Sequence, residues 1–137
     1  MFQKFNVLTE DARKIREEVF IEEQGFKDEF DKIDDRAVHV VFYENKVPAA
    51  VCRYYKGEEE GEYIAGRIAI RKKYRGIHLG NRMMEVLEKL VKEQGGKKIS
   101  LSAQMRVKPF YEKNGFTAIG EPYLDEYCEH IHMEKII

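Results

Sequence analysis

The hydrophobic pattern of the chain changes period near residue 75, and this change limits the folds that are open to it. Before that point, three segments have the length and apolar content of β-strands: 37–43, 47–55 and 63–70. After it, Leu79 to Glu93 carries apolar residues at helical spacing, and a glycine pair at Gly95 ends the segment. The pattern predicts antiparallel strands followed by a long helix.

The remaining segments predict a mixed sheet with helices packed on it. Phe2–Leu8 alternates like a short strand, and Thr9 is a natural N-cap for a helix that runs to about Gln24, before Gly25. The charged stretch 27–36 is a loop or a short helix. Three further strands and a short helix are expected at 98–103, 116–119, 131–137 and 107–114. This order is typical of an α/β or α+β sandwich.

Length, charge and cysteine content exclude several classes of protein. With 137 residues, 43% of them hydrophobic, the chain suits a single domain spanning 1–137. A net charge of -1 with mixed signs argues against nucleic-acid binding. No apolar run reaches the roughly 20 residues that span a membrane, and no secretion signal precedes the first strand. Cys52 and Cys128 form no disulfide framework, so a reducing, cytoplasmic location is expected.

A basic, glycine-containing turn lies between the strand that ends at Ile70 and the helix that begins at Leu79. A strand–turn–helix unit of this kind directs backbone N–H groups and the positive end of the helix dipole at one spot, which suits a phosphate. Gly76 and Gly80 allow close approach of a ligand, and Asn81 suits a helix cap. Positive charge comes from Arg71, Lys72, Lys73 and Arg75. The alternative is an ordinary turn with solvated lysines.

Two common phosphate-binding motifs do not fit this turn. A Walker loop requires Lys-Ser or Lys-Thr after its last glycine, and neither follows Gly80. A dinucleotide-binding fold requires Gly-x-Gly-x-x-Gly early in a parallel βαβ unit, whereas this turn follows antiparallel strands in the middle of the chain.

A second segment of interest is the short helix that begins near Pro109. It carries Tyr111, and Gly115 then turns the chain into a strand. Taken alone, the segment is explained by Phe110 and Phe116 packing in the core with Tyr111 beside them.

Together the two segments resemble the GNAT superfamily of acyl-CoA N-acyltransferases. The turn is similar to the signature Gln/Arg-x-x-Gly-x-Gly/Ala, with Arg75 first and Gly80 last. The second segment is similar to Phe/Leu-Tyr-x-x-x-Gly-Phe and is carried by Phe110, Tyr111, Gly115 and Phe116. Segments 16–24, 102–104 and 130–133 resemble a small single-domain subgroup, the ElaA-like proteins. The likeness spans nearly the whole chain.

The resemblance implies a mixed sheet splayed into a V between its fourth and fifth strands, with the pantetheine arm of acetyl-CoA in the gap. The pyrophosphate would lie on the amides of residues 75–80, and Tyr111 would protonate the leaving thiolate, because a phenol remains a donor at neutral pH. A backbone N–H near Ile70 would bind the oxyanion. The implied cofactor-binding residues are Ile68, Ala69, Ile70, Arg75, Gly76, Ile77, His78, Leu79, Gly80, Asn81, Gln104, Phe110 and Lys113.

The implied activity is acetyl transfer from acetyl-CoA to a primary amine by direct attack within a ternary complex. The acceptor would be a small molecule or a protein amino group, with no metal, nucleic acid or membrane involved. The C-terminal strand offers a possible homodimer contact. The alternative function is a non-catalytic module that binds or senses acyl-CoA.

Two positions depart from the family pattern. His78 stands where the middle glycine is usual, so the turn is expected to bend differently or to direct its imidazole outward. Gln104 stands where many relatives carry Asn, and it retains the ability to hydrogen-bond toward the cofactor arm.

The sequence does not single out one general base. His39, at the start of a strand, is predicted to act as the general base. The alternative is that His39 has only a structural role. Glu22, Glu23 and Asp34 are acidic candidates, and a water-mediated base is equally compatible. His130 and His132 share one face of a strand, but no third ligand has the spacing for a metal site.

Overall fold

The computed structural model describes all 137 residues and contains one mixed, mostly antiparallel sheet, as predicted. The strand order is β1-β2-β3-β4-β5-β7-β6. The strands are β1 (Phe2–Phe5), β2 (Val38–Glu44), β3 (Val47–Lys56), β4 (Glu62–Ile70), β5 (Lys98–Gln104), β6 (Thr117–Asp125) and β7 (Cys128–Ile136). The α-helices are α1 (Glu10–Arg16), α2 (Leu79–Glu93) and α3 (Lys108–Lys113). The fold class predicted from the sequence, α/β with a mixed sheet, is confirmed.

The chain divides into two compact units. The first comprises residues 1–55 and 65–83, and the second comprises residues 56–64 and 84–137. Strand β4 and helix α2 each begin in one unit and end in the other. The expectation of a single domain spanning 1–137 stays a prediction.

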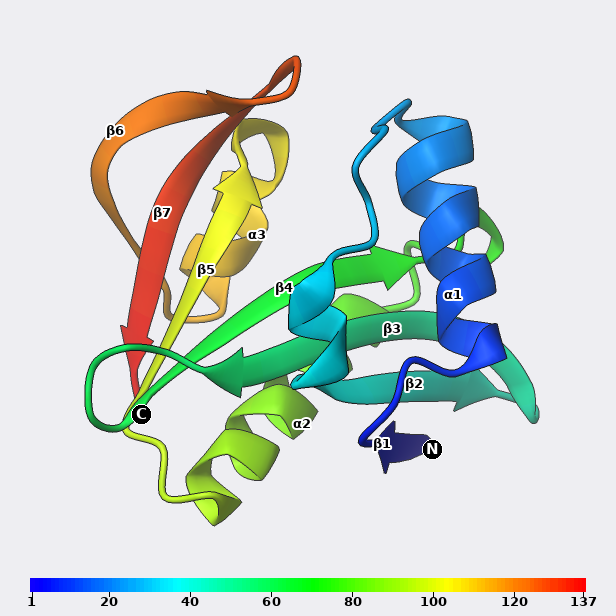
Figure 1. Cartoon of the computed structure of the whole chain (residues 1–137), viewed down its shortest axis with the longest axis horizontal. Helices are drawn as coiled ribbons and strands as arrows, with labels where there is room; N and C mark the ends of the chain where they lie inside the picture. The colour runs from blue at the N-terminus through cyan, green and yellow to red at the C-terminus, as the bar shows by residue number, and fades with distance from the viewer. The chain divides into compact units, whose positions relative to one another are not determined.

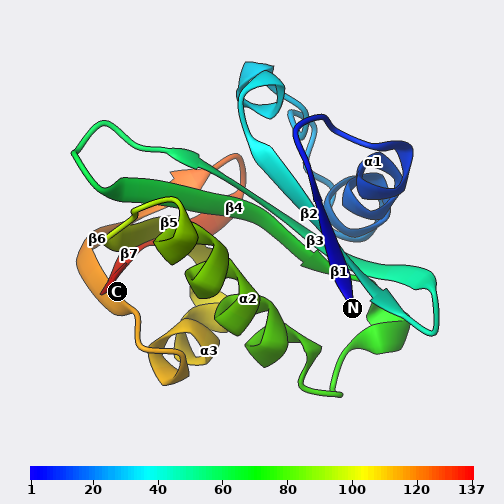
Figure 2. The ribbon, with the colours of Figure 1, turned by 90° about the horizontal axis from the view of Figure 1, so that it is seen from below.

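The first unit is an antiparallel sheet with a helix on one face. Strands β1, β2 and β3 pair antiparallel, and Figure 2 shows α1 beside them. The β2–β3 hairpin turns at Asn45 and Lys46, whose φ angles of 50° and 69° are those of the turn that matches strand twist. Thr9 caps α1 as predicted, since its hydroxyl accepts a hydrogen bond from the Ala12 amide at 3.2 Å.

The first helix reaches the expected end but changes type along its length. The α-helix α1 ends at Arg16, and a π-helix covers Glu17–Glu23 before Gly25 adopts a φ of 76°. The apolar residues Ala12, Ile15, Val19 and Phe20 are all buried. Their spacing suits either helix type, so it predicted the extent of the helix without predicting the wider turn.

The second unit is built on β5, β7 and β6, which pair antiparallel in that order, and the first three residues of β4 pair parallel with Lys98–Ser100. Figure 1 shows α3 behind β5. Three alternate residues of β5 are buried: Ile99, Leu101 and Ala103.

Strands β6 and β7 form a hairpin that is longer than expected. The predicted strands 116–119 and 131–137 are correct in place but too short, because β6 continues to Asp125 and β7 begins at Cys128. Gly120 has a φ of 77°, and the register shifts between Ile119 and Tyr123. Nearly every residue of β6 is exposed, so no alternation of apolar and polar residues marks the strand.

The helices and the two cysteines bear on the expectations drawn from composition. None of its helices has the length and apolar content to cross a membrane. Cys52 is buried and burial raises the pKa of its thiol to about 12, as suits a small core residue, whereas Cys128 is half-buried.

Candidate active site

The turn before α2 leaves a run of backbone amides unengaged. The Arg75 amide donates to the Lys72 carbonyl at 3.3 Å, and the Arg82 amide, within α2, donates to the His78 carbonyl at 3.3 Å. The amides from Gly76 to Gly80 donate to no protein group. They include the first N–H groups of α2, which have no partner within the helix. The turn therefore presents five open donors, beginning one residue later than the sequence suggested.

Two residues of the turn have left-handed backbone conformations. Gly76 has a φ of 83°, and a Cβ added there would meet no atom within 4 Å. His78 has a φ of 62°, so this histidine occupies a conformation that favours glycine. The imidazole is exposed, and its Nδ1 lies 3.5 Å from the Asn81 amide nitrogen. Asn81 lies inside α2, which begins at Leu79, so it is not the N-cap of the helix.

Replacement of His78 by glycine should raise the free energy of unfolding by up to about 1 kcal/mol, because it removes left-handed strain from a residue with a Cβ. Thermal or urea unfolding measures the change. Replacement of the adjacent Ile77 by glycine is the matched control, since Ile77 has no positive φ and should lose stability. Equal losses in both variants would show that the His78 side chain stabilises the turn.

Arg75 and Arg71 connect the turn to other segments of the first unit. The Arg75 Nε donates to the Ile70 carbonyl at 2.8 Å, and its guanidinium pairs with Glu23 at 3.0 Å. The Arg71 Nη1 donates to the Pro48 carbonyl at 3.0 Å. Both guanidinium groups are thus engaged with protein acceptors, and their first role is to stabilise the turn.

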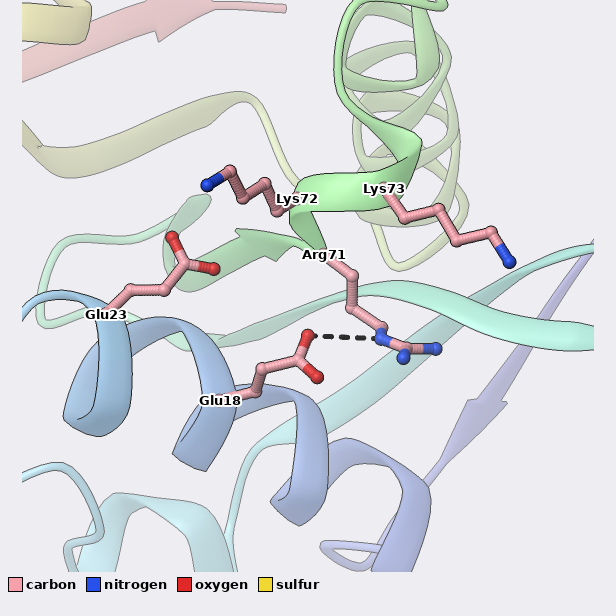
Figure 3. Close-up of a pocket in the computed structure, with 5 residues that line it drawn as sticks. All are labelled: Glu18, Glu23, Arg71, Lys72 and Lys73. Atoms are coloured by element: carbon pink, nitrogen blue, oxygen red, sulfur yellow. Dashed lines mark hydrogen bonds and ion pairs between the residues drawn. The ribbon is translucent and has the colours of Figure 1, made fainter.

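A charged pocket of about 500 Å³ lies beside the turn and is lined by Glu18, Glu23, Arg71, Lys72 and Lys73 (Figure 3). Figure 3 shows Glu18 facing the Arg71 guanidinium, which it contacts at 3.1 Å. Lys72 points toward the Glu23 side, and Lys73 is directed away from both carboxylates. Neither lysine forms an ion pair, so both amino groups add positive potential next to the open amides.

The last residues of β4 lead into this turn. Ala69 is 2% exposed, and the flanking Ile68 and Ile70 are half-buried. Arg67 has a φ of 49°, which interrupts the regular strand conformation just before them. The Arg71 amide donates to the Ala49 carbonyl at 2.9 Å and so ties the end of β4 to β3.

A cluster of charged side chains lies around Arg16 of α1 in the first unit, and no sequence pattern predicted it. Arg16 is 1% exposed and donates to Glu29 and to both oxygens of Asp34, at 2.8 to 3.1 Å. Arg53 donates to Asp34 at 2.8 Å. The buried ion cluster is formed by the buried residues Arg16, Glu29, Asp34 and Arg53, with the half-buried Arg67 and the exposed Asp31 at its edge. Three cations meet three carboxylates, so the cluster is neutral overall.

The cluster shifts the pKa values of its carboxyl groups in opposite directions. Burial alone would raise the pKa of Asp34, but hydrogen bonds from Arg16 and Arg53 outweigh it and lower the pKa to about 2. Burial raises the pKa of Glu29, despite its contacts with Arg67 and Arg16. Asp34, one of the acidic candidates for a general base, is therefore a weak proton acceptor.

His39 lies next to the cluster on β2. It is 1% exposed, and its Nε2 lies 2.9 Å from the Asp34 carbonyl oxygen. Burial lowers the pKa of His39, which favours the neutral imidazole. Since a carbonyl can only accept, Nε2 carries the proton and Nδ1 holds the lone pair.

The remaining site candidates belong to the second unit. Tyr111 on α3 is 7% exposed and makes edge-to-face ring contacts with Phe110 and Phe116, at centroid distances of 5.1 and 5.8 Å. Gln104 ends β5, is half-buried and accepts a hydrogen bond from Arg106 at 3.1 Å. Lys113 is exposed at the end of α3.

The structure thus assembles the candidates in two groups. The residues of 68–81 lie together in the first unit, which also contains His39, while Gln104, Phe110, Tyr111 and Lys113 lie together in the second. No group of three or more His, Cys, Asp or Glu side chains is arranged to hold a metal ion. The expectation of a metal-free site stays a prediction.

Comparison with known proteins assigns the chain to a family. A family model described as "Acetyltransferase (GNAT) domain" matches residues 7–137. The uncharacterized N-acetyltransferase YjcF of Bacillus subtilis (strain 168) is 32% identical over 128 residues, which are 91% of this chain and 90% of YjcF.

Two solved structures have a similar fold. Escherichia coli ElaA is 26% identical, with a TM-score of 0.82 over 98% of this chain and 99% of ElaA. An acyl-CoA N-acyltransferase from Pseudomonas aeruginosa is 25% identical, with a TM-score of 0.85 over 98% of each chain. Matched from residue 7 to its last residue, the chain belongs to the GNAT family of acetyltransferases, a membership that supports N-acyltransferase activity.

Proposed function

We propose that this protein transfers the acetyl group of acetyl-CoA to a primary amine by direct attack within a ternary complex, with residues 1–137 acting as one N-acetyltransferase domain. The observation that carries the proposal is the run of five unengaged amides from Gly76 to Gly80 at the start of α2. Open amides at a helix N-terminus form a site for a phosphate group. A diphosphate supplies the acceptors that these donors lack.

The neighbouring residues suit the rest of acetyl-CoA. Lys72 and Lys73 raise the positive potential around the diphosphate, because neither forms an ion pair and the two carboxylates of the pocket, Glu18 and Glu23, pair with arginines. The backbone of Ile68–Ile70 binds the pantetheine arm, and a backbone N–H near Ile70 stabilises the oxyanion. The contacts proposed in addition are those of Arg75, Asn81, Gln104, Phe110 and Lys113.

Tyr111 acts as the general acid in this scheme. The neutral amine attacks the thioester carbon, the tetrahedral intermediate collapses, and the C–S bond breaks. The phenol then gives its proton to the thiolate and regains one from the new amide nitrogen, so that the products are an amide and a free thiol. The ring contacts with Phe110 and Phe116 fix the orientation of Tyr111 before substrates bind.

The assignment of His39 as general base stays a prediction. The imidazole of His39 is neutral, and the lone pair on its Nδ1 can accept a proton. With 1% of its surface exposed, however, His39 reaches an amine only through intervening water.

The acceptor is proposed at the level of a primary amine. Proteins of similar fold include an aminoglycoside 6'-N-acetyltransferase solved with coenzyme A, with a TM-score of 0.78 at 13% identity. An aminoglycoside, a polyamine, an aromatic monoamine and peptides with a free N-terminus or an internal lysine therefore form a suitable test panel.

The purified protein should release thiol from acetyl-CoA only when an accepting amine is present, and mass spectrometry should find the acetylated product. Calorimetry should show binding of acetyl-CoA that weakens as salt is added, because phosphate contacts are screened. Binding of acetyl-CoA without turnover on any amine of the panel would identify a non-catalytic acyl-CoA-binding module instead.

A further inference from the structure

One face of the sheet in the second unit carries a strip of polar side chains. In the ladder, Ser102 lies opposite His132, and Gln104 lies opposite His130. The same two histidines lie opposite Ile119 and Tyr123 on the other side. Directly paired residues share a face of the sheet. The strip, here called the polar face, consists of Ser102, Gln104, Tyr123, His130, His132 and Glu134.

The polar face is open, whereas the opposite face is covered. Leu101 and Ala103, on the opposite face of β5, are buried, and Figure 1 shows α3 behind this strand. Ser102 and Tyr123 on the polar face are exposed, and His132 is partly exposed. A ligand can therefore reach the polar face in the folded protein.

His132 and Glu134 form a hydrogen-bonded pair on this face. The His132 Nε2 lies 2.8 Å from a Glu134 carboxylate oxygen. Since the carboxylate only accepts, Nε2 carries the proton in neutral His132, and the lone pair is on Nδ1. Nδ1 has no partner in the protein, and the side chain is 42% exposed. An imidazole held by a carboxylate with its other nitrogen open is arranged to accept a proton.

The second histidine of the polar face is arranged differently. His130 is buried, its Nδ1 lies 2.9 Å from the Cys128 carbonyl, and its ring stacks on Tyr123 at 6.2 Å. The Tyr123 hydroxyl is in turn hydrogen-bonded to Ser102. These contacts hold one edge of the face rigid and make His130 a natural comparison for His132.

We propose that His132, oriented by Glu134, accepts the proton of the acceptor amine. This inference rests on the function proposed above. It assigns the role of base to the partly exposed His132 instead of the buried His39. From the sequence, His132 was considered only as a metal ligand. The acceptor arrives as an ammonium ion and gives one proton to Nδ1 of His132, which becomes an imidazolium stabilised by Glu134. The neutral amine then attacks the thioester carbon, and the imidazolium later loses its proton to water.

The position of the pair places it next to a residue of the proposed cofactor site. Gln104, for which a contact with acetyl-CoA is proposed above, shares the polar face with His132, because Gln104 pairs with His130 on the same face of β7. Tyr111 lies on α3, behind β5, so the acid and the base belong to different sides of this strand. Attack of the amine and loss of the thiolate are separate steps through a tetrahedral intermediate, so the two steps can use two different groups.

His132→Gln is the decisive variant, because glutamine can still donate to Glu134. With the best acceptor of the amine panel, kcat/KM at pH 7 should fall about 10²- to 10⁴-fold, the usual contribution of a positioned base. The acetyl-CoA Kd should change less than about twofold. The remaining rate should increase with pH, because only the free amine then reacts. The midpoint of thermal unfolding should stay close to that of the wild type, because a partly exposed pair contributes little to stability.

Two matched variants separate catalysis from packing. Glu134→Gln should cause a smaller loss and move the acidic limb of the rate profile to lower pH, because the imidazolium loses its carboxylate. The charged groups facing His132 are Glu134 and, behind it, Lys98 at 3.6 Å from Glu134, with Glu59 and Glu62 beyond. His130→Gln, on the same strand and face, should keep kcat/KM within about tenfold.

Each outcome has a distinct meaning. Wild-type turnover with an unchanged pH profile in His132→Gln would overturn the base assignment and leave the proposed function standing. Failure of the wild type to acetylate any amine would overturn the proposed function and, with it, this inference. NMR of the histidine nitrogens offers a readout besides activity, and it should find the proton of neutral His132 on Nε2; a proton on Nδ1 would contradict the geometry.

Discussion

Replacement of Tyr111 by phenylalanine should lower kcat for acetyl transfer by about 10²- to 10⁴-fold, because the leaving thiolate loses its proton donor. The acetyl-CoA Kd should stay within about threefold, since the ring that packs against Phe110 and Phe116 is retained. Steady-state kinetics with a saturating amine and calorimetry with acetyl-CoA measure the two quantities. A fall in kcat without a change in Kd is the mark of a group that acts only in the transition state.

Tyr54→Phe is the control for this variant, because Tyr54 is also a buried tyrosine, 1% exposed, and has no proposed contact with substrate. Its kcat should equal that of the wild type within error. A Tyr111→Phe enzyme that is as fast as the Tyr54→Phe enzyme would remove Tyr111 from the chemistry and leave it a packing residue.

Replacement of Asp34 by alanine should lower the free energy of unfolding by about 3 to 5 kcal/mol, the usual loss when one partner of a buried ion pair is removed. Asp34 is 6% exposed and accepts hydrogen bonds from both Arg16 and Arg53. Without it, two buried guanidinium groups lose a shared counter-charge. Urea unfolding followed by circular dichroism measures the change.

Asp35→Ala is the matched control, because Asp35 is the next residue of the same short helix and is exposed. Its effect should be within about 0.5 kcal/mol, as for most surface substitutions. Equal losses in the two variants would show that the buried ion cluster does not stabilise the fold.

The acid dependence of stability provides a second readout for Asp34. Its folded pKa of about 2 lies below the ordinary value of 3.8, so its contribution is present above about pH 3.8 and is lost as the pH falls toward 2. The wild type should lose at most about 2 kcal/mol more than Asp34→Ala across this window. Parallel curves for the two proteins would contradict the lowered pKa.

Features that depend on residues near one another in the chain were predicted well. The helix Leu79–Glu93 was predicted to the residue, because its apolar spacing and the glycines that follow it are local signals. The Thr9 cap and the Asn45 turn were likewise correct. The two family motifs then led to the right fold, since their order along the chain is also a property of the sequence.

Features that depend on residues far apart in the chain were missed. Arg16 falls at the spacing of the buried residues of its helix, but its partners Glu29 and Asp34 are 13 and 18 residues away. A charged stretch has the same composition whether it is solvated or folded over a buried arginine, so 27–36 carried no signal. The exposed half of the β6–β7 hairpin escaped prediction for a similar reason, because cross-strand pairing rather than burial makes it a strand.

The same division applies to the candidate site. By itself, the sequence determined the turn that leaves amides open at the start of α2 and the placement of Tyr111 on a short helix, because both follow from glycine, proline and apolar spacing within a few residues. Only the tertiary structure decided that His39 is buried against Asp34 while His132 stays open beside Glu134. The accessibility and the open nitrogen of a histidine are set by the strands and loops around it, and no local pattern encodes them.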